Sequence, residues 1–96
     1  MTMTQSADHQ LSALDATAVL DEVRGQTSKE LGIAVGEIEP DTVLKQLPGS
    51  DSVRLLRVVA QIERIYDVEL EDEDIFAVRT AQDLADLILA QHRDVA

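Results

Sequence analysis

The core of this chain has to be built almost entirely from aliphatic side chains. Its 96 residues include no cysteine, no tryptophan, one tyrosine and one phenylalanine. A chain of this length forms one small domain with a modest core. Without cysteine, neither a disulfide framework nor a thiolate metal site can hold the domain together. Packed Leu, Val, Ile and Ala must supply the stability, which suits a bundle of short, closely packed helices.

The charge balance limits the classes of partner. Nineteen Asp and Glu residues against eight Lys and Arg residues give a net charge of −11. Such a surface repels phosphate backbones and anionic lipid, so we expect neither nucleic acid nor a membrane as partner. No segment is long and apolar enough for a transmembrane helix, and the N-terminus does not resemble a signal peptide, so the expected location is the cytoplasm. A monomer is expected, because no exposed apolar stripe is evident outside the second predicted helix.

Apolar periodicity predicts a first helix from Thr17 to Leu31. Its buried stripe recurs every four residues, and Gly32 follows as a C-cap. The segment 33–50 then loses its period, and its scattered aliphatic residues predict a long loop that is pinned to the core. The stripe of the first helix consists of Val19, Val23, Thr27 and Leu31.

The second helix, from Val53 to Tyr66, has the clearest helical periodicity and is predicted to be mostly buried. A short third helix is expected at Asp72–Ala77. The last helix starts at Thr80, where Thr80 and Asp83 resemble a capping box with Asp in place of Glu. The apolar stripe of the second helix comprises Val53, Leu56, Val59, Ile62 and Tyr66, widened by Leu55, Val58 and Ile65.

These elements predict an all-α fold, a four-helix bundle with three longer helices, a short third helix and a long loop between the first two. The expected organisation is a flexible N-terminal tail at 1–12, one domain at 13–92 and a C-terminal tail at 93–96.

The most informative short segment is Gly49-Ser50-Asp51-Ser52-Val53, which directly precedes or opens the second helix. The Ser52 hydroxyl can cap exposed backbone N–H groups there. The same helix end favours a negatively charged group on that serine by about 0.3–1 kcal/mol. Taken alone, a serine or aspartate at such a boundary is most commonly a simple cap.

This segment resembles the G-x-D-S-[LIV] signature of acyl and peptidyl carrier proteins, whose serine accepts 4′-phosphopantetheine from coenzyme A. The resemblance extends over about Thr17 to Gln91. Its further landmarks are Leu31-Gly32-Ile33, Ile38, Asp41-Thr42, Val68-Glu69-Leu70, and the apolar positions Leu84 and Ile88 of the last helix.

The resemblance implies a stand-alone carrier that catalyses nothing itself. Ser52 would be the phosphopantetheine attachment site, and Asp51 would help present this serine to the transferase. The docking face for partner enzymes would include Val53, Arg54, Leu56 and Arg57. The implied partners are a phosphopantetheinyl transferase, a loading enzyme (an adenylation enzyme or acyltransferase) and a downstream synthase or transferase. An acyl, malonyl-type, aminoacyl or β-aminoacyl cargo would fit one arm as a thioester.

Two features depart from the family pattern. Leu47-Pro48-Gly49 makes the loop before the serine one residue longer than in many fatty-acid carriers. The second helix also carries Arg54, Arg57 and Arg64 where fatty-acid carriers are usually acidic. Like charges across an interface are costly, so we infer dedicated partners in polyketide or nonribosomal peptide biosynthesis of natural products. A fatty-acid synthase carrier is the alternative, with arginines that merely pair with nearby carboxylates.

Other candidate sites have weaker support. The acidic segment Asp67–Asp74 lacks the Gly and Glu that an EF-hand loop requires, so a solvated face or docking patch is the better interpretation. His9 and His92 lack metal-ligand spacing and are poorly placed to serve Ser52 as a base. Phe76 and Tyr66 are expected to anchor the core, although in a carrier they would border a cargo groove. If Ser52 is only a cap, the chain is instead an unmodified acidic helical adaptor.

Overall fold

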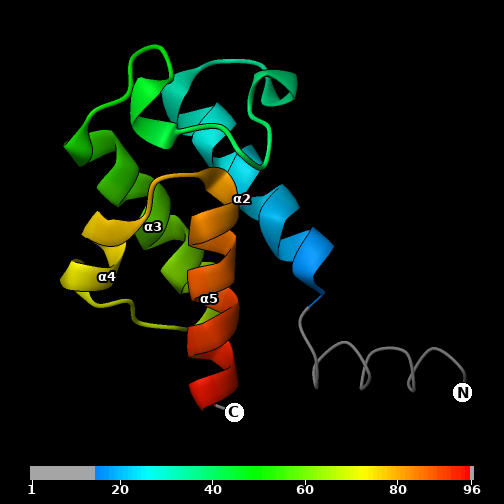
Figure 1. Cartoon of the computed structure of the whole chain (residues 1–96), viewed down its shortest axis with the longest axis vertical. Helices are drawn as coiled ribbons and strands as arrows, with labels where there is room; N and C mark the ends of the chain where they lie inside the picture. The colour runs from blue at the N-terminus through cyan, green and yellow to red at the C-terminus, as the bar shows by residue number, and fades with distance from the viewer. Residues whose placement is uncertain (1–14, 96) are drawn as a thin grey trace, which may run out of the picture.

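The computed structural model describes residues 15–95, which form a bundle of helices (Figure 1). Within this part of the chain the only β-pairing is an isolated bridge between Val43 and Thr80, so the predicted all-α class is confirmed. No helix in this range is long and apolar enough to span a membrane. The helices are α2 (Ala16–Leu31), α3 (Ser52–Tyr66), α4 (Asp72–Ala77) and α5 (Ala81–Val95), with short 3-10 helices η1 (Val35–Glu37) and η2 (Leu44–Gln46).

Helix α2 begins and ends close to the predicted residues. The Asp15 carboxylate accepts a hydrogen bond from the Thr17 backbone N–H at 3.0 Å, which caps the first turn. Gly32 ends the helix in the left-handed region, with φ of 68°. The buried side chains of α2 are Val19, Val23 and Thr27, so three positions of the predicted stripe are buried while Leu31 is partly exposed.

Helix α2 packs against both α3 and α5, and these three helices enclose the core (Figure 1). The short α4 lies to one side of the bundle. In the chain it follows α3 and precedes α5. The core is aliphatic, as the composition predicts. Its members are Val19, Val23, Ile38, Leu44, Leu47, Val58, Val59, Ile62, Val68, Leu70, Ala81, Leu84, Ala85 and Ile88.

The long connection between α2 and α3 is pinned to the bundle, as predicted. Ile38, Leu44 and Leu47 are buried in the core. The Leu44 backbone N–H also donates to the Arg79 carbonyl at 2.9 Å. The loop before α3 is therefore fixed from both sides, by apolar packing and by backbone pairing.

Helix α5 starts with the predicted capping box. The Asp83 backbone N–H donates to Thr80 Oγ1 at 3.0 Å, and the Thr80 backbone N–H donates to Asp83 Oδ2 at 3.1 Å. The helix continues to Val95, into the range 93–96 that was expected to be a tail. The predicted N-terminal tail at 1–12 lies outside the described residues.

The exposure of α3 differs from the prediction. Val58, Val59 and Ile62 are buried, but Val53, Leu56 and Ile65 are 59%, 40% and 46% exposed. The helix is therefore half covered rather than mostly buried. Because α4 has only six residues, much of the face of α3 beyond α2 stays open to solvent.

Candidate functional site

A tight turn delivers the chain to the start of α3. The Ser50 backbone N–H donates to the Leu47 carbonyl at 3.0 Å, which closes a four-residue turn over Pro48 and Gly49. Gly49 has φ of 79° at the third position of the turn, as a type II turn requires. Pro48 suits the second position because its ring fixes φ near −65°. The additional residue noted in the sequence is thus absorbed by a regular turn.

The N-cap of α3 is Asp51, not Ser52. Asp51 Oδ1 accepts a hydrogen bond from the Arg54 backbone N–H at 2.8 Å, and Ser52 is the first helical residue. The expectation that the Ser52 hydroxyl caps the helix is therefore wrong, because the preceding carboxylate already fills that role. Within residues 15–95 the Ser52 hydroxyl has no hydrogen-bond partner, and the residue is exposed. No side chain or backbone group of the described residues therefore occupies this hydroxyl.

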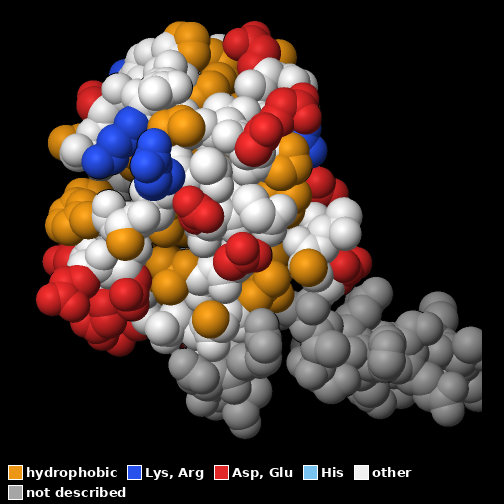
Figure 2. All heavy atoms as spheres, in the orientation of Figure 1, with side chains coloured by type: hydrophobic (Ala, Val, Ile, Leu, Met, Phe, Trp, Pro, Cys, Tyr) orange, Lys and Arg blue, Asp and Glu red, His pale blue; other side chains and the backbone are white. Residues whose placement is uncertain are grey.

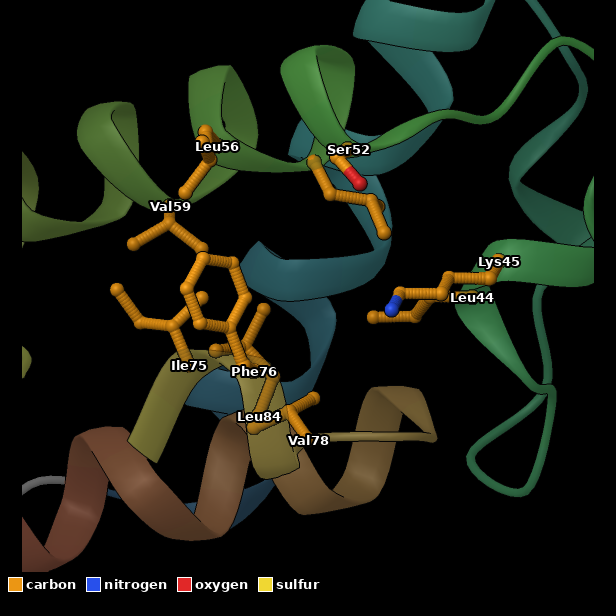
Figure 3. Close-up of a pocket in the computed structure, with 10 residues that line it drawn as sticks. Leu44, Lys45, Ser52, Leu56, Val59, Ile75, Phe76, Val78 and Leu84 are labelled. Carbon is orange, nitrogen blue, oxygen red and sulfur yellow. The ribbon is translucent and has the colours of Figure 1, made fainter. Parts of the chain in front are cut away.

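Ser52 stands at the rim of an apolar hollow between α3, α4 and η2 (Figure 3). The hollow has a volume of about 30 Å³, which is room for about two water molecules. It is too small to enclose a long acyl chain unless the helices move apart. The residues that line it are Leu44, Lys45, Ser52, Leu55, Leu56, Val59, Ile75, Phe76, Val78 and Leu84.

Phe76 is part of this hollow and not an anchor of the core. Its side chain is 61% exposed, and Figure 3 shows its ring beside Val59 and Ile75. The expectation of a core anchor is wrong for Phe76, because α4 is too short to bury both faces; the alternative, a groove-bordering residue, agrees with its position. Tyr66 packs against the core and does not line the hollow. Burial, and then the negative charge of Glu22, raise the pKa of Tyr66 above its ordinary value of 10.0.

Two arginines of α3, Arg54 and Arg57, differ in their contacts and in their exposure. The Arg54 guanidinium donates to the Glu30 carbonyl at 3.0 Å, near the C-terminal end of α2. Arg57 approaches the Glu30 carboxylate at 3.4 Å, but its side chain is 67% exposed, so this pair contributes little. Arg54 is therefore occupied by an internal contact, whereas Arg57 remains available on the surface.

The acidic segment after α3 is held by the buried side chains of Val68 and Leu70 and by hydrogen bonds to Glu63. Glu63 Oε2 accepts a hydrogen bond from the Leu70 backbone N–H at 2.8 Å. No group of three or more potential ligands converges on a metal position within the described residues. Of the two histidines, His92 lies near the C-terminal end of α5, away from the lining of the hollow, and His9 is outside the described residues.

One charged residue of the site was missed by the sequence analysis. Lys45 lines the hollow together with Ser52, although seven positions separate them along the chain. In the sequence, Lys45 is a lone lysine between Leu44 and Leu47. The loop has no regular spacing that would predict which way this side chain points. Figure 2 shows the contrast in charge on this face, with acidic side chains gathered around α4 and a small basic patch near the start of α3.

Comparisons with known proteins agree with this geometry. The family profile described as "Phosphopantetheine attachment site" matches residues 21–88. The chain is 28% identical over 75 residues to the acyl carrier protein of Syntrophobacter fumaroxidans, covering 78% of this chain and 93% of that protein. It is 21% identical over 76 residues to the acyl carrier protein of Rubrobacter xylanophilus, covering 79% and 94%. The chain therefore belongs to the acyl carrier protein family, whose members are carriers rather than enzymes and use phosphopantetheine as their cofactor.

Proposed function

We propose that Ser52 is the attachment site of 4′-phosphopantetheine and that the chain shuttles acyl or aminoacyl intermediates between partner enzymes. The observation that carries this proposal is the exposed, unbonded Ser52 hydroxyl on the first turn of α3, next to an aspartate cap. Asp51 holds the first turn through Arg54 N–H and so fixes the direction in which the serine points. This hydrogen bond supports the proposed role of Asp51 in presenting Ser52 to the transferase.

The attachment step is a displacement at phosphorus. Ser52 Oγ attacks the pantetheine-side phosphorus of coenzyme A, and a new Oγ–P bond forms. The bond from that phosphorus to the bridging pyrophosphate oxygen breaks, 3′,5′-ADP leaves, and the hydroxyl proton passes to a base on the transferase. The N-terminus of α3 favours the resulting phosphodiester by about 0.3–1 kcal/mol. The terminal thiol of the arm supplies the thioester chemistry.

We further propose that Val53, Leu56 and Arg57 form the docking face. Val53 and Leu56 are 59% and 40% exposed on α3, close to the serine that carries the cargo. Arg57 adds an exposed positive charge on the same helix. Arg54 stabilises this face through its hydrogen bond to the Glu30 carbonyl of α2. Because a tethered cargo has a high effective concentration, weak protein contacts are sufficient.

The exposed arginines favour partners of a polyketide or nonribosomal peptide pathway over those of a fatty-acid synthase. An enzyme that recognises an acidic second helix presents positive charge, which Arg57 and Arg64 repel. Arg64 is exposed in the last turn of α3. The fatty-acid synthase carrier remains the competing assignment.

The attachment site is tested by intact mass after incubation with coenzyme A and a broad-specificity phosphopantetheinyl transferase. We expect the wild type to gain the mass of one phosphopantetheine and Ser52→Ala to gain none. Ser50→Ala is the matched control, since Ser50 lies two residues away with a buried hydroxyl, and it should be modified like the wild type. A folded wild-type protein that gains no mass would favour the adaptor function.

The pathway assignment is tested with the modified protein and a malonyltransferase of a fatty-acid synthase that docks on acidic helices. We expect malonylation to be on the order of tenfold slower than for a fatty-acid carrier, and Arg57→Glu to accelerate it. Arg79→Glu makes the same change of charge away from α3 and should have little effect. Wild-type malonylation as fast as that of a fatty-acid carrier would contradict the assignment.

A further inference from the structure

A single cation faces the hollow beside Ser52. Lys45 belongs to η2, between the buried residues Leu44 and Leu47. The Leu44 backbone N–H is bound to the Arg79 carbonyl at 2.9 Å, so the backbone that carries Lys45 is fixed. Figure 3 shows its side chain reaching from η2 into the hollow, with the amine on the side of Ser52. This position results from tertiary packing and not from closeness in the chain.

The charge of Lys45 has no evident internal purpose. It is the only charged side chain among the residues that line the hollow, and Ser52 is the only other polar one. In the described part of the chain the two ion pairs join Arg24 to Asp21 and Arg57 to Glu30, and neither includes Lys45. Carboxylates far outnumber lysines in this chain, yet Lys45 forms an ion pair with none of them within the described residues.

We propose that Lys45 binds the phosphodiester that modification places on Ser52, and thereby directs the first segment of the arm across the hollow. The inference rests on the proposed attachment at Ser52. A phosphodiester carries one negative charge and accepts hydrogen bonds from an ammonium group. Before modification, the other polar group that lines the hollow with Lys45 is the uncharged hydroxyl of Ser52. After modification, the same side chain closes an ion pair at the rim of the hollow.

The contact is exposed to solvent, so its effect is modest and depends on salt. Exposed ion pairs change an equilibrium by about 1.5- to 5-fold, and we expect Lys45→Gln to reduce the odds of the bound arm by this factor. At about 1 M salt the screening length falls to roughly 3 Å, and the difference between wild type and variant should largely disappear.

The composition of the chain gives the experiment an internal control, because Lys29 and Lys45 are its only lysines. NMR spectra of the protein labelled on its lysine side chains, recorded before and after phosphopantetheine transfer, follow both in one sample. Lys29 lies in the last turn of α2, outside the hollow. We expect the Lys45 side-chain signals to shift on modification and those of Lys29 to stay in place.

The phosphorus NMR signal of the modified protein reports the other side of the contact. It should move in Lys45→Gln, return toward the wild-type position in Lys45→Arg, and stay unchanged in Lys29→Gln. If the mass shows a modified Ser52 but neither the Lys45 signals nor the phosphorus signal responds, the Lys45 proposal is overturned and the attachment site stands. If Ser52 is not modified at all, both proposals fail.

Discussion

Gly49 shows how one backbone angle shapes the approach of the chain to Ser52. Its φ of 79° lies in the left-handed region, which costs side-chain-bearing residues about 1–2 kcal/mol. An added Cβ at Gly49 would meet nothing within 4 Å, so conformational strain is the only penalty. The turn over Pro48 and Gly49 therefore depends on glycine for its backbone angle and not for space.

We expect Gly49→Ala to lower the free energy of unfolding by about 1 kcal/mol, measured by urea denaturation. Gly36→Ala is the matched control, because Gly36 also has open space around its Cα but no positive φ. That substitution should be neutral or slightly stabilising. Equal effects at both positions would contradict the strained turn.

Tyr66 provides a second prediction at the scale of one residue. It is the only tyrosine, so the phenolate absorbance of the protein reports this side chain alone. Burial and the nearby Glu22 charge raise its pKa, so the absorbance midpoint of the folded protein should lie above 10.0 and that of the unfolded chain near it. Because the folded-state pKa is the higher one, this group's contribution to stability is complete below the unfolded pKa and is lost as pH rises through the folded pKa. A folded midpoint at or below the unfolded one would refute the burial.

Among the elements, α5 illustrates how local signals define a helix. The exchange of hydrogen bonds between Thr80 and Asp83 fixes its first turn, while Leu84 and Ile88 bury one face. Backbone N–H groups of Thr80 and then Arg79 hold the pKa of Asp83 below its ordinary value of 3.8. The folded state therefore favours the ionised form of this carboxylate.

We expect Thr80→Ala to lower the free energy of unfolding by about 1 kcal/mol near neutral pH, because it removes the capping hydroxyl.

The stabilisation by the Asp83 carboxylate is complete above the unfolded pKa and is lost as pH falls through the lower folded pKa. We therefore expect the melting temperatures of wild type and Asp83→Asn, measured from pH 6 downward, to converge at low pH. A difference in melting temperature that stays constant with pH would exclude this role of the carboxylate.

For the whole molecule, the sequence predicted the helices well because caps and periodicity are local. Gly32, the Thr80–Asp83 box and the stripe of Val19 and Val23 each mark an element with residues a few positions apart. The bundle class and the carrier family followed from them and from the segment around Ser52.

The features that the sequence did not predict depend on which side chains are covered by elements distant in the chain. Periodicity assigns Val53 and Leu56 to an apolar face, but only the short α4 determines that this face stays open. The apolar side chain of Phe76 likewise predicts a place in the core, but the structure leaves it exposed. Lys45 could not be linked to Ser52, because their proximity arises when the loop is pinned against α3 and α5. The open face, the exposed phenylalanine and the lysine all belong to the candidate site.

Fragment mass can locate the proposed phosphopantetheine on one serine of the chain. Trypsin cleaves after Lys45 and Arg54, so a single peptide, 46–54, contains both Ser50 and Ser52. Tandem mass spectrometry of this peptide from the transferase-treated protein distinguishes the two serines. We expect phosphopantetheine on Ser52 and none on Ser50. Modification at Ser50, or an unmodified peptide from folded protein, would contradict this expectation.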